Sequence, residues 1–207
     1  MFESEEIHRR AMLMNKIIRS LLCTLAITAF PGLADSSHVS GQMRKTVEFL
    51  SLTAPLPDAW IEEQASSSMR LAQFLIPGGD NRGDAELVLY YFGQGQGGSA
   101  EANIARWKSQ FTTASGGAAN PSVETMAVSG MPVTVVELRG NYARSVGMGP
   151  AATPKPDQIL LATIVETPRG NVYIQLYGPA QAVAIQREAY MHFIRNIKPL
   201  ADQSSGR

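Results

Sequence analysis

The sequence predicts an α+β fold built on a largely antiparallel sheet. Six or seven strand-like segments, most of them joined by short turns, accompany only two helical segments, and hairpin connections give antiparallel pairs. Residues 85–92 and 158–167 are apolar in both alternating sets of side chains, so each of these strands should be covered on both sides. We therefore expect helices on both faces of the sheet, which makes an αβα sandwich.

The first half of the chain is predicted to hold three strands. They cover residues 46–52, 69–76 and 85–92. Pro55 and Pro57 force an extended turn ahead of Trp60. The breaker at residues 77–80 and the polar tip at residues 81–84 separate the second strand from the third.

A glycine-rich loop at residues 93–98 leads into the first predicted helix. Ser99 can cap this helix, which we expect to run to about Thr113, and Glu101 stands in the favourable first turn. The predicted buried stripe consists of Ile104, Trp107 and Phe111. Trp60 and Trp107 are both expected in the core.

The second half is predicted to form two hairpins and a closing helix. The strands cover residues 123–128, 133–138, 158–167 and 171–177. Turns are expected at Ser129-Gly130 and at Pro168-Arg169-Gly170, and residues 142–157 are expected to form a long loop. Gly178-Pro179 opens the final helix. Its apolar face is predicted to consist of Ile185, Ala189, Phe193 and Ile197.

Composition limits the number of domains and the classes of partner. The chain has 207 residues, 44% of them hydrophobic, and its 18 Lys and Arg balance its 18 Asp and Glu. This size suits one domain, which we place at residues 46–199, between a loose segment at 35–45 and a polar tail at 200–207. A net charge of zero offers no basic patch for nucleic acid.

The N-terminal segment is typical of a signal peptide. Lys16 and Arg19 precede an apolar run at residues 21–33, and small residues allow cleavage after Ala34. Acidic residues ahead of Lys16 indicate that translation could begin at Met12 or Met14. We therefore expect residues 1–34 to be removed and the mature protein to be periplasmic or secreted.

The same segment has two other possible fates, a membrane anchor and a lipidated N-terminus. Arg19 interrupts the apolar run, which leaves too few residues to span a bilayer, so we expect no transmembrane segment in the mature chain. Cys23 could be lipidated, but Leu22 is larger than the small residue expected before such a cysteine. Cleavage after Ala34 would remove the only cysteine, so no disulfide would support the mature fold.

The order of the elements resembles that of a known group of exported domains. The features are the proline-Trp segment at residues 57–60, the strand pair before the helix at 99–113, the hairpins at Gly130 and Gly170, and the closing helix. Together, over residues 46–199, they resemble the PsbP and DcrB-like superfamily. That resemblance implies a mostly non-enzymatic accessory or binding role, and it is architectural, because it includes no catalytic or ligand motif.

The glycine loop at residues 93–98 formally matches a GxGxxG motif between a strand and a helix. No acidic residue follows about 20 positions later at the end of a parallel strand, so dinucleotide binding is disfavoured. The remaining interpretations are a site for a small anionic ligand or a protein partner, and plain turn chemistry. The candidate binding residues are Gly95, Gly97, Gly98, Asn103 and Arg106.

The sequence carries no motif for metal, cofactor or catalysis. His38 and His192 are the histidines that remain after cleavage, and no GxSxG, SxxK or HExxH pattern occurs. We therefore predict no metal site, no cofactor and no catalytic residue. Two hypotheses remain, an exported binding or accessory module of the bacterial envelope and a hydrolase whose Ser, His192 and Asp come together from distant positions.

Overall fold

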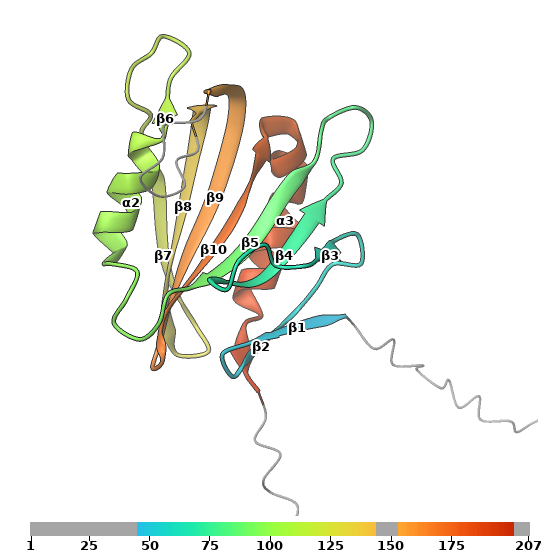
Figure 1. Cartoon of the computed structure of the whole chain (residues 1–207), viewed down its shortest axis with the longest axis vertical. Helices are drawn as coiled ribbons and strands as arrows, with labels where there is room; N and C mark the ends of the chain where they lie inside the picture. Colours follow the sequence, from blue (N-terminus) through green and yellow to red (C-terminus); the bar gives the residue numbers. More distant parts are fainter. Residues whose placement is uncertain (1–44, 144–152, 201–207) are drawn as a thin grey trace, which may run out of the picture. The chain divides into compact units, whose positions relative to one another are not determined.

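The computed structural model describes residues 45–143 and 153–200, which belong to one compact unit of the chain, residues 42–207 (Figure 1). The predicted signal peptide at residues 1–34, Cys23 and His38 lie outside the described residues, as does the tail from residue 201. None of the described helices combines the length and the apolar character needed to cross a membrane.

Two helices and eleven strands, several of them short, make up the described part of the chain. In order they are β1 (Thr46–Phe49), β2 (Leu52–Pro55), β3 (Ile61–Glu63), β4 (Arg70–Ile76), β5 (Ala85–Tyr91), α2 (Ala100–Ser109), β6 (Phe111–Thr112), β7 (Ser122–Val128), β8 (Met131–Tyr142), β9 (Lys155–Thr167), β10 (Gly170–Pro179), α3 (Ala180–Arg195) and β11 (Lys198–Pro199).

The strands form two antiparallel sheets. The larger has the order β3-β4-β5-β10-β9-β8-β6, with β7 also paired to β8, and the smaller has the order β1-β2-β11. The predicted α+β fold with a largely antiparallel sheet is therefore confirmed. The long strands β8, β9 and β10 lie side by side at the centre of the large sheet (Figure 1).

Both predicted hairpins are confirmed, and the predicted loop between them is shorter than expected. Strands β7 and β8 meet at Ser129-Gly130, and β9 and β10 meet around Pro168-Arg169. Strand β8 continues to Tyr142 and β9 already begins at Lys155, where the two residues pair. The predicted loop at residues 142–157 was wrong at both ends, because its proline-rich C-terminal end joins the ladder, and residues 144–152 lie outside the described residues.

The predicted single strand at residues 46–52 is a hairpin instead. Strand β1 ends at Phe49, Leu50 and Ser51 form the turn with φ angles of 49° and 76°, and β2 pairs back with β1. Left-handed φ angles at two residues that are neither glycine nor asparagine are uncommon, so this turn has no sequence signature. The edge strand β3 was not predicted either.

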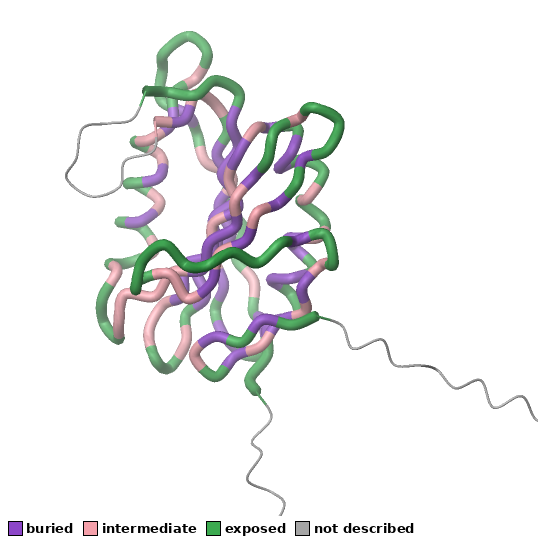
Figure 2. The backbone as a smooth tube through the Cα atoms, turned by 45° about the vertical axis from the view of Figure 1, so that its right-hand side comes forward, coloured by how far each residue is buried: buried purple, intermediate pink, exposed green. Residues whose placement is uncertain are grey.

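The buried side chains gather in two clusters that involve alternate residues of the same strands. Figure 2 colours the buried positions of the backbone purple. The Tyr190 cluster contains Leu161, Val165 and Ile174 of the sheet with Val183, Tyr190 and Phe193 of α3. The Trp107 cluster contains Leu160, Ala162, Ile164 and Tyr173 of the sheet with Trp107 of α2. Because successive side chains of a strand point to opposite faces, the central strands are buried on both faces, as predicted.

Helix α2 begins where it was predicted to begin and ends four residues early. The Ser99 side chain accepts a hydrogen bond from the Ala102 amide at 3.2 Å. The Glu101 backbone amide and the Ser99 hydroxyl lower the pKa of the Glu101 carboxyl. The predicted end at Thr113 was wrong, because Phe111 leaves the helix and pairs with Tyr142 as part of β6. Trp107 and Phe111 are buried as predicted.

The predicted apolar face of α3 was wrong in its phase. Ile185 is 55% exposed and Ala189 is partly buried, whereas Phe193 and Ile197 are buried as predicted. The residues that α3 buries include Ala182, Val183, Tyr190, Phe193 and Ile194. The choice of Ile185 followed its size, but α3 turns the smaller Ala182 and Val183 inward and Ile185 outward.

Two buried polar contacts tie elements to the Tyr190 cluster. The Tyr190 hydroxyl lies 2.7 Å from the Thr163 hydroxyl on β9 and donates to the Ile174 carbonyl on β10 at 3.1 Å. Since the phenol has one proton, the Thr163 hydroxyl is the donor in their mutual bond. Trp60 is fully buried, and its indole N–H donates to Gln186 of α3 at 3.1 Å, so both tryptophans belong to the core as predicted.

Candidate functional site

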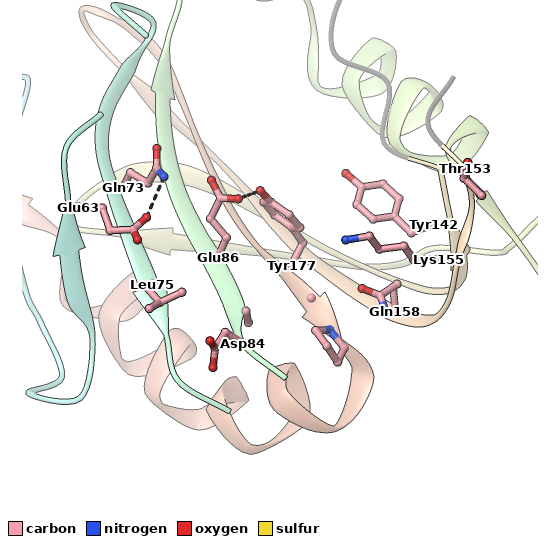
Figure 3. A pocket seen from close by; sticks show the side chains of 13 residues that line it. Glu63, Gln73, Leu75, Asp84, Glu86, Tyr142, Thr153, Lys155, Gln158 and Tyr177 are labelled. Atoms are coloured by element: carbon pink, nitrogen blue, oxygen red, sulfur yellow. Dashed lines mark hydrogen bonds between the residues drawn. The ribbon is translucent and has the colours of Figure 1, made fainter. Parts of the chain in front are cut away.

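A cavity of about 450 Å³ opens beside the strand ends of the large sheet. Strands β3, β4 and β5 supply one side of it, the ends of β8 and β9 supply the other, and β10 lies between them (Figure 3). The lining residues are Glu63, Gln73, Leu75, Asp84, Ala85, Glu86, Tyr142, Thr153, Lys155, Gln158, Tyr177, Gly178 and Pro179.

The base of the cavity depends on a close approach between β10 and β5. A Cβ atom on Gly178 would lie 2.8 Å from the Ala85 Cα atom, which is closer than real contacts allow. Glycine at this position therefore lets β10 reach β5 directly before Pro179 and α3 begin. Any side chain there would push the two strands apart at the cavity.

A continuous polar network forms the β3–β5 wall of the cavity. Arg70 donates to Glu86 at 2.6 Å and to Gln73 at 2.7 Å, and Gln73 donates to Glu63 at 2.9 Å. The Tyr177 hydroxyl donates to the other oxygen of the Glu86 carboxylate. Arg70 also lies over the Tyr90 ring, with its guanidinium carbon 5.5 Å from the ring centre. Its side chain is only 14% exposed, so this ion pair is better shielded from water than a surface pair.

Asp84 adds a third carboxylate to the same wall. It stands directly before β5, and its Oδ1 atom accepts a hydrogen bond from the Gly78 amide at 3.1 Å. Glu63, Asp84 and Glu86 together carry three negative charges, and Arg70 offsets one of them. Among the described residues, carboxylates therefore outnumber cations on this wall.

The opposite wall presents a cation, a phenol and an amide. Lys155, Tyr142 and Gln158 point from β8 and β9 toward the Glu86–Tyr177 pair (Figure 3). Tyr142 is fixed by stacking on Phe111, with ring centres 4.5 Å apart, and by an edge contact with Tyr177 at 6.1 Å. Lys155 is the only cationic residue among the described residues that line the cavity. The cavity is thus negative on one side and positive on the other.

The predicted glycine-loop residues lie at a different place, around the start of α2. The Asn103 side chain, which is 2% exposed, donates to the Gly97 carbonyl at 2.8 Å and to the Ser99 carbonyl at 2.9 Å. Tyr173 donates to the Gly98 carbonyl at 2.9 Å. A Cβ atom on Gly97 would lie 2.7 Å from the Tyr173 ring, and Gly97 has a φ angle of +90°. Gly97, Gly98 and Asn103 are thus held together by the fold itself.

Arg106 joins this group through Asn103, and Gly95 does not. Arg106 lies on an exposed part of α2 and donates to the Asn103 side-chain oxygen at 2.5 Å. Gly95 has no neighbouring atom within 4 Å of a built Cβ atom, and its φ angle of +69° is a turn requirement. The buried amide of Asn103 is fully used by the loop and by Arg106. Binding of an anion or a protein at these residues stays a prediction.

The described residues contain no group of three or more His, Cys, Asp or Glu side chains placed to hold a metal ion. His192 lies exposed on α3 and does not line the cavity. The prediction that the chain works without metal or cofactor stays a prediction.

Comparison with known proteins gives structural matches alone. No family model matches the chain, and no curated protein does. The chain is similar in structure to a PsbP protein. That structure is PsbP (CyanoP) from the cyanobacterium Synechocystis, which shares 12% identity at a TM-score of 0.49, over 81% of this chain and 99% of that one.

Two further solved structures match over most of their length. LpqN, involved in cell envelope biogenesis of Mycobacterium tuberculosis, shares 13% identity at a TM-score of 0.47, over 77% of this chain and 88% of that one. PA94, a protein of unknown function from Pseudomonas aeruginosa, shares 13% identity at a TM-score of 0.42, over 75% of this chain and 96% of that one. A PsbP structure is thus among the matches, as the order of elements predicted, and the likeness concerns the fold alone.

The cavity residues were missed by sequence reasoning because they are far apart in the chain. Glu86 and Tyr177 are 91 positions apart and meet only because β5 pairs with β10. Two weak signals were present in the sequence. Glu86 is a lone acid inside an apolar strand, and Lys155 lies between two prolines where the sheet ends.

Proposed function

We propose that this chain is a non-enzymatic binding module that takes a small polar ligand into the cavity between β5, β10 and β9. The observation that carries this proposal is the cavity itself, whose volume of about 450 Å³ suits a small molecule. Ligand sites of roughly 300–1,000 Å³, apolar over much of their surface with a few converging polar groups, are typical of proteins that bind small molecules.

The fixed positions of the polar side chains support binding. Arg70, Gln73 and Glu63 hold one another, and Glu86 is held from two sides by Arg70 and Tyr177. A ligand that contacts this wall meets groups whose positions are already fixed, so little conformational entropy is lost when it binds. Stacking on Phe111 fixes Tyr142 on the other wall in the same way.

The residues of the cavity favour binding over hydrolysis. Its described lining includes no serine, cysteine or histidine, which are the usual nucleophiles and bases of a hydrolase. The Glu86 carboxylate is already held in place by hydrogen bonds from an arginine and from a phenol. Within the described part of the chain, no comparable geometry supports the hydrolase hypothesis.

Nuclear magnetic resonance with a library of small polar compounds tests the proposal. We expect at least one compound to shift the amide signals of the lining residues and to remain chemically unchanged after prolonged incubation. Leu75→Trp, which fills the cavity from β4, should abolish these shifts, whereas Val123→Trp at an exposed position of β7 should keep them. Shifts that persist in a folded Leu75→Trp variant would contradict the proposal, and conversion of the compound would indicate an enzyme.

We also propose that the protein is exported to the bacterial envelope, as an accessory module of the periplasm or as a secreted protein. The pattern of Lys16, Arg19, the apolar run at 21–33 and Ala34 supports this proposal. Intact mass of the protein made in a secreting bacterial host is expected to lack residues 1–34. Recovery of the chain from the cytoplasm with residues 21–33 still attached would contradict it.

A three-layer arrangement within residues 46–199 is part of the same proposal. Trp107 of α2 belongs to one buried cluster and the residues of α3 belong to the other, which supports helices on opposite faces of the sheet. Expression of residues 46–199 tests whether this segment folds alone as one domain. A fragment with the melting behaviour of the full chain is expected, and an unfolded fragment would contradict the boundaries.

A further inference from the structure

We infer that the ligand of this cavity is zwitterionic, with an ammonium group against the β3–β5 wall and a carboxylate against Lys155. This inference rests on the proposed function, because it names the ligand class of the same cavity. The first observation is the separation of charge across it. Glu63, Asp84 and Glu86 lie on one side, and Lys155 lies on the other (Figure 3).

Among the described residues, the negative wall holds more carboxylates than its one cation, Arg70, can neutralise. Arg70 pairs with Glu86. Among the described contacts, Asp84 accepts a hydrogen bond only from the Gly78 amide, and Glu63 accepts one only from the Gln73 side chain. An ammonium ligand brings the positive charge that this wall needs. It also donates three hydrogen bonds, and the wall is rich in acceptors.

The wall that carries Lys155 favours a negatively charged group. The Lys155 ammonium points across the cavity and can donate hydrogen bonds (Figure 3). The Gln158 amide lies on the same wall but already donates to the Pro156 and Asp157 carbonyls, at 2.9 and 3.3 Å. A carboxylate accepts several hydrogen bonds at once and binds most strongly where one donor is charged. A ligand that carried only a cation would leave Lys155 facing an apolar or positive end.

The sheet sets the spacing between the two charges. Strand β10 separates β5 from β9, so Glu86 on β5 and Asp84 directly before it are two strand spacings from the strand of Lys155, which is roughly 10 Å. Glu63 on β3 is two strand spacings farther away. An extended peptide rises about 3.3 Å per residue, so two or three residues span roughly 7–10 Å between the terminal amine and the terminal carboxylate. A dipeptide or tripeptide with free ends has the charges and the length that this cavity fits.

Three forms of one dipeptide test the inference by titration calorimetry with the full chain. The probes are alanyl-alanine, its N-acetyl form, which lacks the ammonium, and its C-terminal amide, which lacks the carboxylate. We expect alanyl-alanine to bind about tenfold or more tightly than either blocked form, since each lost charge-assisted hydrogen bond costs about that factor. The preference should weaken at high salt, because the charges face an open cavity.

Variants assign each end of the dipeptide to its wall. In Lys155→Gln, alanyl-alanine and its amide should bind equally, while Lys198→Gln, an exposed lysine on β11, should bind like the unaltered chain. In Asp84→Asn combined with Glu63→Gln, alanyl-alanine and its N-acetyl form should bind equally. Both amides can keep the hydrogen bonds that the carboxylates accept from Gly78 and Gln73, so these changes remove charge while keeping the contacts.

The outcomes separate this inference from the proposed function. If a neutral sugar or the doubly blocked dipeptide binds in the cavity as tightly as alanyl-alanine, and Leu75→Trp abolishes that binding, the cavity is a ligand site and the zwitterion is wrong. Unchanged probe preferences in Lys155→Gln would likewise overturn the inference. If Leu75→Trp leaves the binding of every probe unchanged, the proposed function itself fails.

Discussion

Tyr190 and Thr163 form a buried pair of hydroxyl groups. Removing both hydroxyls should lower the free energy of unfolding by less than the sum of the losses that each single removal causes. Tyr190 is fully buried, its hydroxyl accepts from Thr163 at 2.7 Å, and it donates to the Ile174 carbonyl at 3.1 Å. The pair joins α3 to β9 and β10 of the sheet. The variants are Tyr190→Phe, Thr163→Val and the double change, all of which nearly preserve side-chain volume.

The magnitudes follow from which group each change leaves unpaired. Tyr190→Phe removes two hydrogen bonds and leaves the buried Thr163 hydroxyl without its acceptor, which should lower the free energy of unfolding by about 2–3 kcal/mol. Thr163→Val removes one bond while the phenol still donates to Ile174, so the loss should be about 0.5–1.5 kcal/mol. The double variant leaves no hydroxyl behind. It should be more stable than the sum of the single losses predicts, by about 1 kcal/mol.

Urea unfolding followed by tryptophan fluorescence measures all three variants. Tyr91→Phe is the matched control, because the Tyr91 hydroxyl donates to the Arg169 carbonyl in an exposed hydrogen bond. Its loss should stay within about 0.5 kcal/mol. If Tyr190→Phe cost no more than this control, or if the two single losses added without coupling, the buried network would not contribute as described.

Three further predictions concern single positions. Gly97→Ala should lower the melting temperature more than Gly95→Ala, because both need a positive φ angle but only the first brings a Cβ atom against an aromatic ring; equal losses would contradict this. Trp107→Ala should cost about 3–5 kcal/mol and Arg106→Ala less than about 1 kcal/mol in denaturant melts, and the reverse order would mean that the buried face of α2 is wrongly assigned. Burial raises the pKa of Tyr190 above its usual value, so the unfolded chain loses this proton first as the pH rises. The stability that the neutral phenol contributes is present below about pH 10 and is lost above it, at about 1.4 kcal/mol per pH unit; melts at pH 9 to 11.5 should show this slope in the unaltered chain and lose that part of it in Tyr190→Phe.

Local patterns were enough to predict most of the sheet. Apolar segments bounded by turn residues located β4, β5, β7 and β9 to within a few residues, and Ser129-Gly130 located a hairpin turn because glycine tolerates a left-handed φ angle. Ser99 predicted the start of α2, since a serine side chain can accept from the first free amides of a helix. These features depend on neighbours within a few positions, which the sequence contains.

Other features depend on contacts between residues that are far apart in the sequence. The turn at Leu50 and Ser51 is held in its left-handed conformation by the pairing of β1 with β2, and Arg169 donates to the Ser51 hydroxyl at 3.0 Å from 118 positions away. The buried face of α3 was misassigned because Ile185 has a larger side chain than Val183. Which of the two faces the sheet is decided by the angle at which the helix packs, and that angle is a property of the assembled core.

The cavity could not be predicted from local sequence patterns for a related reason. Glu86 stands alone among apolar residues of β5, and its partners Arg70 and Tyr177 come from neighbouring strands of the sheet. A charged residue in an apolar strand indicates a partner somewhere in the fold, because an unpaired buried charge is costly. The sequence could therefore have shown that Glu86 needs a partner without showing which residue supplies it.

The position of the cavity follows from where the apolar packing around Trp107 ends. Helix α2 is ten residues long and packs on β8 and β6. Across the sheet from β8 to β4, one row of paired residues reads Leu138, Leu160, Tyr177, Glu86 and Leu75. The two leucines nearest the helix are fully buried, Tyr177 is partly buried with its hydroxyl directed to Glu86, and the Glu86 side chain is 26% exposed. The charged residue of this row, Glu86, lies where water can reach it. Because α2 is short, the polar wall on β5 and β4 stays open to a ligand.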